Sequence, residues 1–315
     1  MAYRAGTIRP RQLTWVDRSG ASLGTIGDQD ATIAAPRVAP DGHRVAFSRV
    51  AQNNRDIWLQ DGGRTVRMTF DASLEAYPTW SPDGTRIAYL SARSGAGDLF
   101  EKRTNGAGTE ERLVTSNSIK FPSSWSPDGR FLLYFTVDLK NRADIWVLPI
   151  TGDRKPFLFL QTPFTDVWGQ FSPDGRWVAY QSDESGRDEV YVRPFVPPGD
   201  VIATGMATGG QWQISTDGGL HPVWRADGKE LYYINLSSEM MAAPIKSTGG
   251  VFAPGVPVRL FKSNVAYGGV DDATGRQYDV AADGRFLINA ELEAGTTPPI
   301  TLIQNWNPDP KKPQP

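Results

Sequence analysis

The pentapeptide Gly20-Ala-Ser-Leu-Gly24 matches the Gly-x-Ser-x-Gly pattern in which serine hydrolases present their nucleophile. That chemistry requires a strand-to-helix turn at the serine, a histidine base and an acid further along the chain. Here the pentapeptide lies between two short strand-like segments, and no helical pattern follows it. We therefore expect Ser22 to lie in a hairpin turn and not to act as a nucleophile.

Metal and phosphate chemistry have few candidate ligands. The chain has two histidines and no cysteine, whereas zinc sites combine several such ligands. His43 follows a turn and is expected to be solvated. The acidic segments Asp28-Gln-Asp30 and Asp271-Asp272 offer oxygen ligands for calcium, but neither has the EF-hand layout, so we expect solvated loops. No cofactor and no metal are predicted, with a calcium ion in a loop or channel left open.

Composition limits the classes of partner. The 315 residues carry 33 Lys and Arg against 35 Asp and Glu, a net charge of −2, so no basic surplus favours nucleic acid or a membrane surface. No apolar run approaches the roughly 20 residues that span a bilayer. Residues 1–6 do not resemble a secretory signal. The chain is therefore expected to be cytoplasmic or to be a piece of a longer protein.

A short motif that ends in Asp-Gly recurs along the whole chain. Its aspartates are Asp41, Asp83, Asp128, Asp174, Asp227 and Asp283, at intervals of 42 to 56 residues. That period is close to the ~40–50 residues of a four-stranded propeller blade. Three of the six copies read Ser-Pro-Asp-Gly. Pro, Asp and Gly each favour a tight turn, so we assign these aspartates to structural turns and not to catalysis.

Each copy of the motif is surrounded by the same short segments. A large or β-branched residue stands three positions before the aspartate, and a run of strand-forming residues follows the glycine, as in Trp177-Val-Ala-Tyr-Gln181. A polar loop and, in four repeats, an acidic-aromatic strand such as Asp144-Ile-Trp-Val147 come next. These patterns predict an all-β, six-bladed β-propeller of four-stranded antiparallel blades, with essentially no helix.

The ends of the chain must complete the sixth blade, because an open ring would expose blade edges. Strand-like segments at 13–17 and 23–26 precede the first repeat, and those at 285–291 and 300–306 follow the last marker. The simplest closure takes three strands from the C-terminus and one from the N-terminus, and two from each end is the alternative. Residues 1–307 are predicted to form one propeller and residues 308–315 a Pro/Lys-rich tail.

Binding is expected where the loops that enter the six blades converge around the channel, on the face opposite the Pro-Asp-Gly turns. Aromatic and charged residues suit a pocket, since apolar walls bury a ligand and polar groups orient it. The longer late intervals favour the side near Trp168, His221 and Arg276. The full candidate set is Asp71, Glu75, Tyr77, Lys120, Phe121, Asp166, Trp168, His221 and Arg276. The alternative is that each aromatic residue wedges between neighbouring blades.

The segment Phe171-Ser-Pro-Asp-Gly-Arg-Trp-Val-Ala-Tyr180 resembles the TolB-type propeller repeat, and the likeness recurs in register over nearly the whole chain. Segments 13–20, 152–157, 191–195 and 300–306 are similar to the C-terminal propeller of bacterial receptor-type serine/threonine protein kinases. The chain itself has no His-Arg-Asp loop, no Asp-Phe-Gly and no membrane helix. The resemblance implies the propeller of a membrane-anchored parent, outside the cytoplasm, with a sensory or binding role.

Three functions follow from these observations. The first is a non-catalytic, monomeric sensor propeller that binds a small ligand, a peptide or an envelope protein. The second is a TolB-like scaffold for envelope proteins. The third is a propeller enzyme of lyase, lactonase or glycosidase type, which would need a metal ion or paired carboxylates in the channel.

Overall fold

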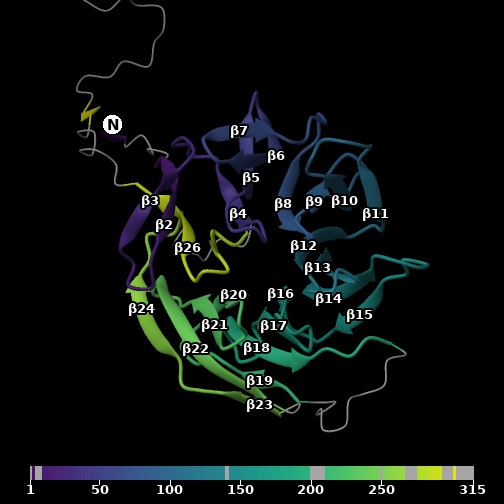
Figure 1. Cartoon of the computed structure of the whole chain (residues 1–315), viewed down its shortest axis with the longest axis vertical. Coiled ribbons are helices and arrows are strands. Elements are labelled where there is room, and N and C mark those ends of the chain that lie inside the picture. The colour runs from purple at the N-terminus through teal and green to yellow at the C-terminus, as the bar shows by residue number, and fades with distance from the viewer. Residues whose placement is uncertain are drawn as a thin grey trace, which may run out of the picture.

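Six antiparallel sheets surround a central axis in the computed structural model (Figure 1). The structure describes residues 2–3, 9–138, 142–198, 210–248, 251–266, 275–292 and 301–302. These residues contain no α-helix, and no helix that could cross a membrane was found among them. The predicted all-β six-bladed propeller is therefore confirmed.

Blades 1 to 4 each contain four strands, which run from the axis outward in chain order. Blade 1 consists of β4 (Ala34–Val38), β5 (Val45–Ala51), β6 (Asn54–Asp61) and β7 (Arg64–Arg67). Blade 2 consists of β8 (Glu75–Trp80), β9 (Arg86–Ser91), β10 (Asp98–Arg103) and β11 (Glu111–Val114). Blade 3 consists of β12 (Ile119–Trp125), β13 (Phe131–Asp138), β14 (Arg142–Pro149) and β15 (Phe157–Leu160). Blade 4 consists of β16 (Asp166–Phe171), β17 (Trp177–Ser182), β18 (Glu189–Pro194) and β19 (Trp212–Gln213).

Blade 5 departs from the predicted four strands. It consists of β20 (Leu220–Trp224), β21 (Glu230–Ile234), β22 (Glu239–Thr248), β23 (Val251–Pro254) and β24 (Val258–Lys262). The ten-residue strand β22 is long enough to pair with two short strands, β24 along residues 239–242 and β23 along residues 245–248.

The closing blade takes two strands from each end of the chain. Its order is β25 (Tyr278–Val280), β26 (Phe286–Glu291), β2 (Arg11–Val16) and β3 (Ser22–Ile26), and the N-terminal strands lie beside β26 (Figure 1). The preferred three-plus-one closure is therefore wrong, and the two-plus-two alternative is correct. Strand β27 (Thr301–Leu302) instead pairs with β1 (Ala2–Tyr3), and the tail at 308–315 lies outside the described residues.

A tight turn explains why both N-terminal strands enter the closing blade. Gly20 N donates to Asp17 O, and Asp17 Oδ1 accepts hydrogen bonds from the backbone N of Ser19 and Ala21. Two strands joined in this way form a hairpin and join a sheet as a unit. The Gly-x-Ser-x-Gly segment therefore belongs to a hairpin, as predicted, but Ser22 itself is the first residue of strand β3 and does not lie in the turn.

The repeated Asp-Gly segments form the predicted turns between the first and second strands of every blade. All six glycines have positive φ, from 65° at Gly84 to 88° at Gly284, and each donates its N–H to the carbonyl three residues earlier. In every copy the aspartate accepts a hydrogen bond from the backbone N two residues later, as Asp174 Oδ1 does from Arg176. The structural assignment of the six aspartates is confirmed.

Replacing Gly175 by Val is expected to destabilise the fold by roughly 1–3 kcal/mol, because a β-branched residue is forced into the left-handed region. Gly175 has φ 71°, and an added Cβ would lie 3.6 Å from Pro127, so strain and not a clash causes the loss. Urea unfolding would measure the change. Gly63 is the control, since its φ is not in this region and its Cβ would meet open space; equal losses at both positions would contradict the turn argument.

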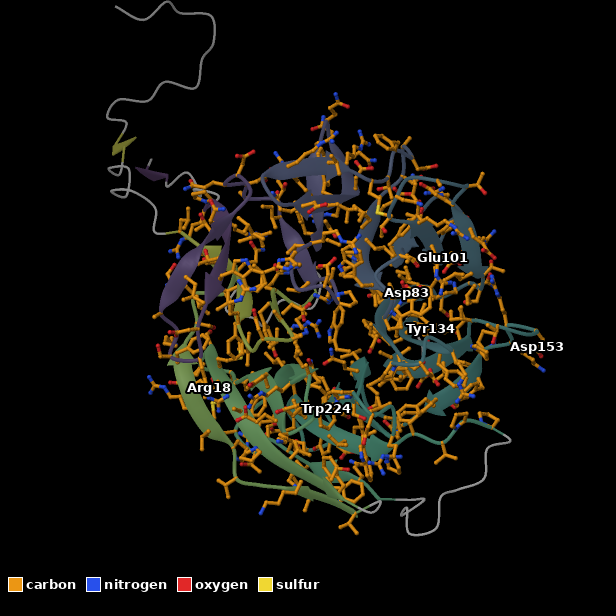
Figure 2. All side chains as sticks on the ribbon, in the orientation of Figure 1. Arg18, Asp83, Glu101, Tyr134, Asp153 and Trp224 are labelled. Atoms are coloured by element: carbon orange, nitrogen blue, oxygen red, sulfur yellow. The ribbon has the colours of Figure 1, made fainter. Side chains whose placement is uncertain are left out.

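The residue three positions before the turn aspartate packs between blades. Trp80 and Trp224 are both buried, and their indole Nε1 atoms donate to Arg37 O and Gln170 O of the preceding blades at 3.0 and 3.2 Å. Figure 2 shows Trp224 toward the centre of the ring, whereas Arg18 and Asp153 lie at its outer edge. These tryptophans therefore tie the inner ends of neighbouring blades together.

Candidate functional site

The aromatic residues predicted on the entry-loop side do converge on the axis. Tyr77 of blade 2 lies 5.0 Å from Phe121 of blade 3 and 6.1 Å from Trp168 of blade 4, measured between ring centroids. Trp168 also makes an edge contact with His221 of blade 5 at 5.2 Å. A Cβ at Gly275, just before β25, would lie 2.9 Å from the Tyr77 ring and 3.1 Å from Trp168. Residues of five blades therefore meet across the channel.

These aromatic side chains fill the channel at this level. Trp168 is 5% exposed and His221 is 1% exposed, and Tyr77 is also buried. All three have left-handed backbones, with φ of 54° to 60°, and each lies at an irregularity in strand pairing. Such conformations are costly for bulky residues and persist only where the surroundings impose them. The cluster is a rigid aromatic layer, and its direct part in ligand binding stays a prediction.

Two of the predicted acidic residues are buried at the starts of inner strands. Glu75 accepts a hydrogen bond from Ser91 Oγ at 3.2 Å and pairs with Arg93, while burial raises its pKa. Asp166 accepts from Thr162 Oγ1 at 2.6 Å, and burial raises its pKa as well. Neither residue is exposed, so in this conformation both carboxylates bind side chains within their own blades and do not face the channel solvent.

The predicted lysine is likewise enclosed. Lys120 Nζ lies 2.7 Å from Asp98 Oδ1 and donates to the carbonyls of Ser116 and Ser118 at 3.2 and 2.8 Å. The two side chains of this ion pair are 1% and 2% exposed. Lys120 thereby fastens the connection between blades 2 and 3 to strand β10, and its ammonium group has no free surface toward the channel.

The remaining sequence candidates lie apart from this cluster. Asp71 accepts a hydrogen bond from Ser73 N at 2.8 Å, which lowers its pKa, and lies 3.7 Å from the Arg93 guanidinium. His43 is exposed, as predicted. Asp30 is bound by Thr32 and Arg49. Segment 271–272 lies outside the described residues, and no group of three potential metal ligands was found among the described ones.

A hollow of about 260 Å³ lies at the other level of the channel, toward the Pro-Asp-Gly turns. Its walls are the last residues of inner strands and the first residues of their turns, including Trp80, Trp125 and Trp224. One lining residue per blade stands four positions before the turn aspartate. This ring, which is polar except for Val223, consists of Arg37, Thr79, Ser124, Gln170, Val223 and Asp279.

The described residues that line this hollow carry two cations and one anion. Arg276 Nη2 donates to Asp279 Oδ1 at 2.9 Å, and Asp279 Oδ2 accepts from Val38 N at 2.8 Å. Arg37 Nη1 donates to the carbonyls of Pro36 and Arg276 at 2.8 and 3.2 Å. Burial, together with the neighbouring Arg276 cation, lowers the pKa of Arg37 to about 9, so it stays charged at neutral pH.

Sequence reasoning missed all six ring residues, and it placed Arg276, which also lines the hollow, on the entry-loop side. The sequence did contain a signal. When the repeats are aligned on their turn aspartates, the position four residues earlier varies between Arg, Thr, Ser, Gln, Val and Asp, whereas the next position is always large or β-branched. The prediction instead followed the convergence of the entry loops on the opposite face. The segment 267–274, which leads to Arg276, lies outside the described residues, so the structure describes only part of the entry-loop side.

Part of the chain is similar in sequence to known propeller proteins. Residues 16–145 match the family model described as TolB beta propeller domain. These residues carry TolB-type propeller repeats. The Tol-Pal system protein TolB of Desulfosudis oleivorans is 31% identical over 112 residues, which are 35% of this chain and 25% of that protein. Tricorn protease homolog 1 of Streptomyces coelicolor is 35% identical over 118 residues, 36% of this chain and 11% of that protein.

The structural likeness extends further than the sequence likeness. A putative TolB from Agrobacterium tumefaciens superimposes with a TM-score of 0.65 and 14% identity, over 91% of this chain and 99% of that one. At this identity the TolB-type propeller match shows the fold alone. The chain spans no more than a quarter of the lengths of the two relatives matched by sequence, so their activities do not transfer to it directly.

Proposed function

We propose that this TolB-type propeller is a non-catalytic binding module that holds a segment of a protein partner in the hollow at the turn end of its channel. The observation that carries the proposal is the hollow itself. It combines tryptophan walls with a ring of mostly polar residues at one level, and sites of this kind bury a ligand while polar groups fix its orientation. Tryptophan and arginine are also the residues that most often dominate protein interfaces.

The likeness to TolB supports a protein-interaction scaffold more than it supports the other predicted functions. It extends over nearly the whole chain in structure, and a Tol-Pal system protein is among the relatives by sequence. The connection to a kinase sensor rests on the sequence resemblance alone. We retain an extracytoplasmic location on the same resemblance, and we keep the expected monomeric state as a further part of the proposal.

A peptidase role is the second candidate, because a tricorn protease homologue also carries a related segment. That segment is 11% of the relative, which leaves most of its length outside the match. Under this alternative the chain would act as the propeller part of a larger hydrolase, and the hollow would still serve to bind a peptide. Release of fragments from a casein substrate by this chain alone would contradict the non-catalytic proposal, whereas the propeller part of a larger hydrolase would bind casein without cleaving it.

The proposal is tested by blocking the hollow from its rim. Ala226 and Ala282 are exposed small residues at its edge, so the double change Ala226→Trp and Ala282→Trp fills the mouth without removing core packing. We expect this variant to lose at least about tenfold in affinity for the peptides that the unmodified chain selects from an array of decapeptides with free C-termini, a loss of ~1.4 kcal/mol or more.

The matched control makes the same type of change on the opposite face. Ala96 is exposed in the loop between β9 and β10, on the entry-loop side of blade 2. Ala96→Trp should bind the selected peptides as the unmodified chain does. If Ala96→Trp abolishes binding and the rim variant does not, the entry-loop site predicted from the sequence is correct and the proposal is wrong. An array with no bound peptide would also contradict it.

A further inference from the structure

The hollow contains more positive charge than its own residues neutralise. Among the described residues, its charged lining residues are Arg37, Arg276 and Asp279. Both carboxylate oxygens of Asp279 already accept a hydrogen bond, one from Arg276 and one from Val38 N. Asp279 is hydrogen-bonded to Arg276 and also attracts the Arg37 charge, so one carboxylate faces two guanidinium groups. The hydrogen-bond partners of Arg37 itself are two backbone carbonyls.

Arg37 has donor capacity left over. The side chain is 5% exposed, both of its recorded bonds come from Nη1, and Nε has no acceptor. A guanidinium group has five N–H donors arranged in a planar fork, and a buried donor without an acceptor is costly. Nε is closed off from the hollow, whereas Nη2 makes no hydrogen bond and is not enclosed, so an anion that approaches from the hollow would meet Nη2.

A second unpartnered group lies in the same wall. Thr79 occupies the same repeat position as Arg37 in the next blade, is 5% exposed, and has no partner for Oγ1. Its hydroxyl is enclosed in the wall in this conformation, and a rotation about χ1 would be needed for it to donate to an anion beside Arg37. A cation, by contrast, would meet Arg37 and Arg276 and would find both oxygens of Asp279 occupied.

We infer that the hollow binds its ligand through a carboxylate group held by Arg37 and Thr79, with Arg276 adding positive potential. This deepens the proposed function and rests on it for the identity of the ligand as a peptide. Planar carboxylates match the guanidinium fork, which gives charge-assisted hydrogen bonds with defined geometry. A hollow of about 260 Å³ accommodates a terminal residue of a chain and not a folded domain.

The first experiment uses acetate and acetamide, which have the same shape and differ in charge. The indole N–H signals of Trp80 and Trp224 report on the hollow, because both residues line it. We expect acetate to shift these signals saturably and acetamide not to do so. Arg37→Gln keeps donors for the two backbone carbonyls and removes the charge, and should weaken acetate binding about 10- to 100-fold. Thr79→Val, a change of similar size, should weaken it less.

The outcomes separate this inference from the proposed function. Inorganic phosphate is titrated in parallel, and saturable shifts with phosphate but not with acetate would overturn the carboxylate assignment. Equal binding of acetate by Arg37→Gln and the unmodified chain would overturn it as well. The selected decapeptides are also compared with C-terminal carboxamide copies, which should bind at least tenfold more weakly. If the carboxamides bind equally well and the rim variant still blocks them, the inference fails and the proposed function stands.

Discussion

Removal of residues 1–20 is expected to lower the melting temperature by at least about 10 °C or to prevent folding. The deletion removes β2, which pairs with β26 at six positions and supplies the third strand of the closing blade. Leu13, Trp15 and Val16 of this strand are all buried. Burying three such side chains stabilises a fold by roughly 5–9 kcal/mol, which is comparable with the 5–15 kcal/mol net stability of ordinary domains. The loss also opens the ring and exposes the edge of β26.

Differential scanning calorimetry measures this effect, with two controls. A chain that lacks residues 1–8 retains β2 and should melt within a few degrees of the full chain. Trp15→Ala keeps the strand and removes one packed side chain, so its melting temperature should lie between those of the two deletions. A twenty-residue deletion that melts like the full chain would show that β2 does not close the ring.

The sequence was sufficient to predict the architecture, because the repeat encodes it locally. The turn formed by Asp174 and Gly175 has the same backbone in all six copies, and this regularity arises from residues adjacent in the chain. Closure depends on which distant segments pair with one another, and local sequence patterns do not determine that pairing. The partner of β26 is decided by the Asp17–Ala21 turn, which brings β3 into the blade together with β2.

The candidate site was predicted less completely for a related reason. Residue types could be assigned to the channel, and Tyr77, Trp168 and His221 do meet there. Their depth depends on the irregular strand pairing that gives each of them a left-handed backbone, a feature that aromatic residues do not signal. Likewise, the sequence does not show that Lys120 forms a buried ion pair with Asp98, whereas Arg37 keeps N–H donors without an acceptor.

The Lys120–Asp98 pair leads to the second large effect, since each charge is buried and depends on the other. Asp98→Ala should destabilise the fold by about 3–5 kcal/mol, because it leaves the ammonium group in the interior with backbone carbonyls alone. Arg112, the other cation that contacts Asp98, has a side chain that is 42% exposed and can turn toward water. Lys120 has no such route, with 1% of its side chain exposed.

A double variant distinguishes the cost of an unpaired charge from the cost of lost packing. Asp98→Leu combined with Lys120→Met replaces the pair by apolar groups, and such replacements of buried ion pairs are often neutral or stabilising. We therefore expect urea unfolding to show the double variant to be more stable than Asp98→Ala by at least about 2 kcal/mol. A double variant as unstable as the single one would mean that the pair is needed for the shape of the blade 2 to blade 3 connection. If Asp98→Ala alone lowers the free energy of unfolding by under about 1 kcal/mol, the Lys120 ammonium group reaches solvent. Lys120 could then bind a ligand in the channel, as the sequence predicted, and acetate titration of Lys120→Met would test this.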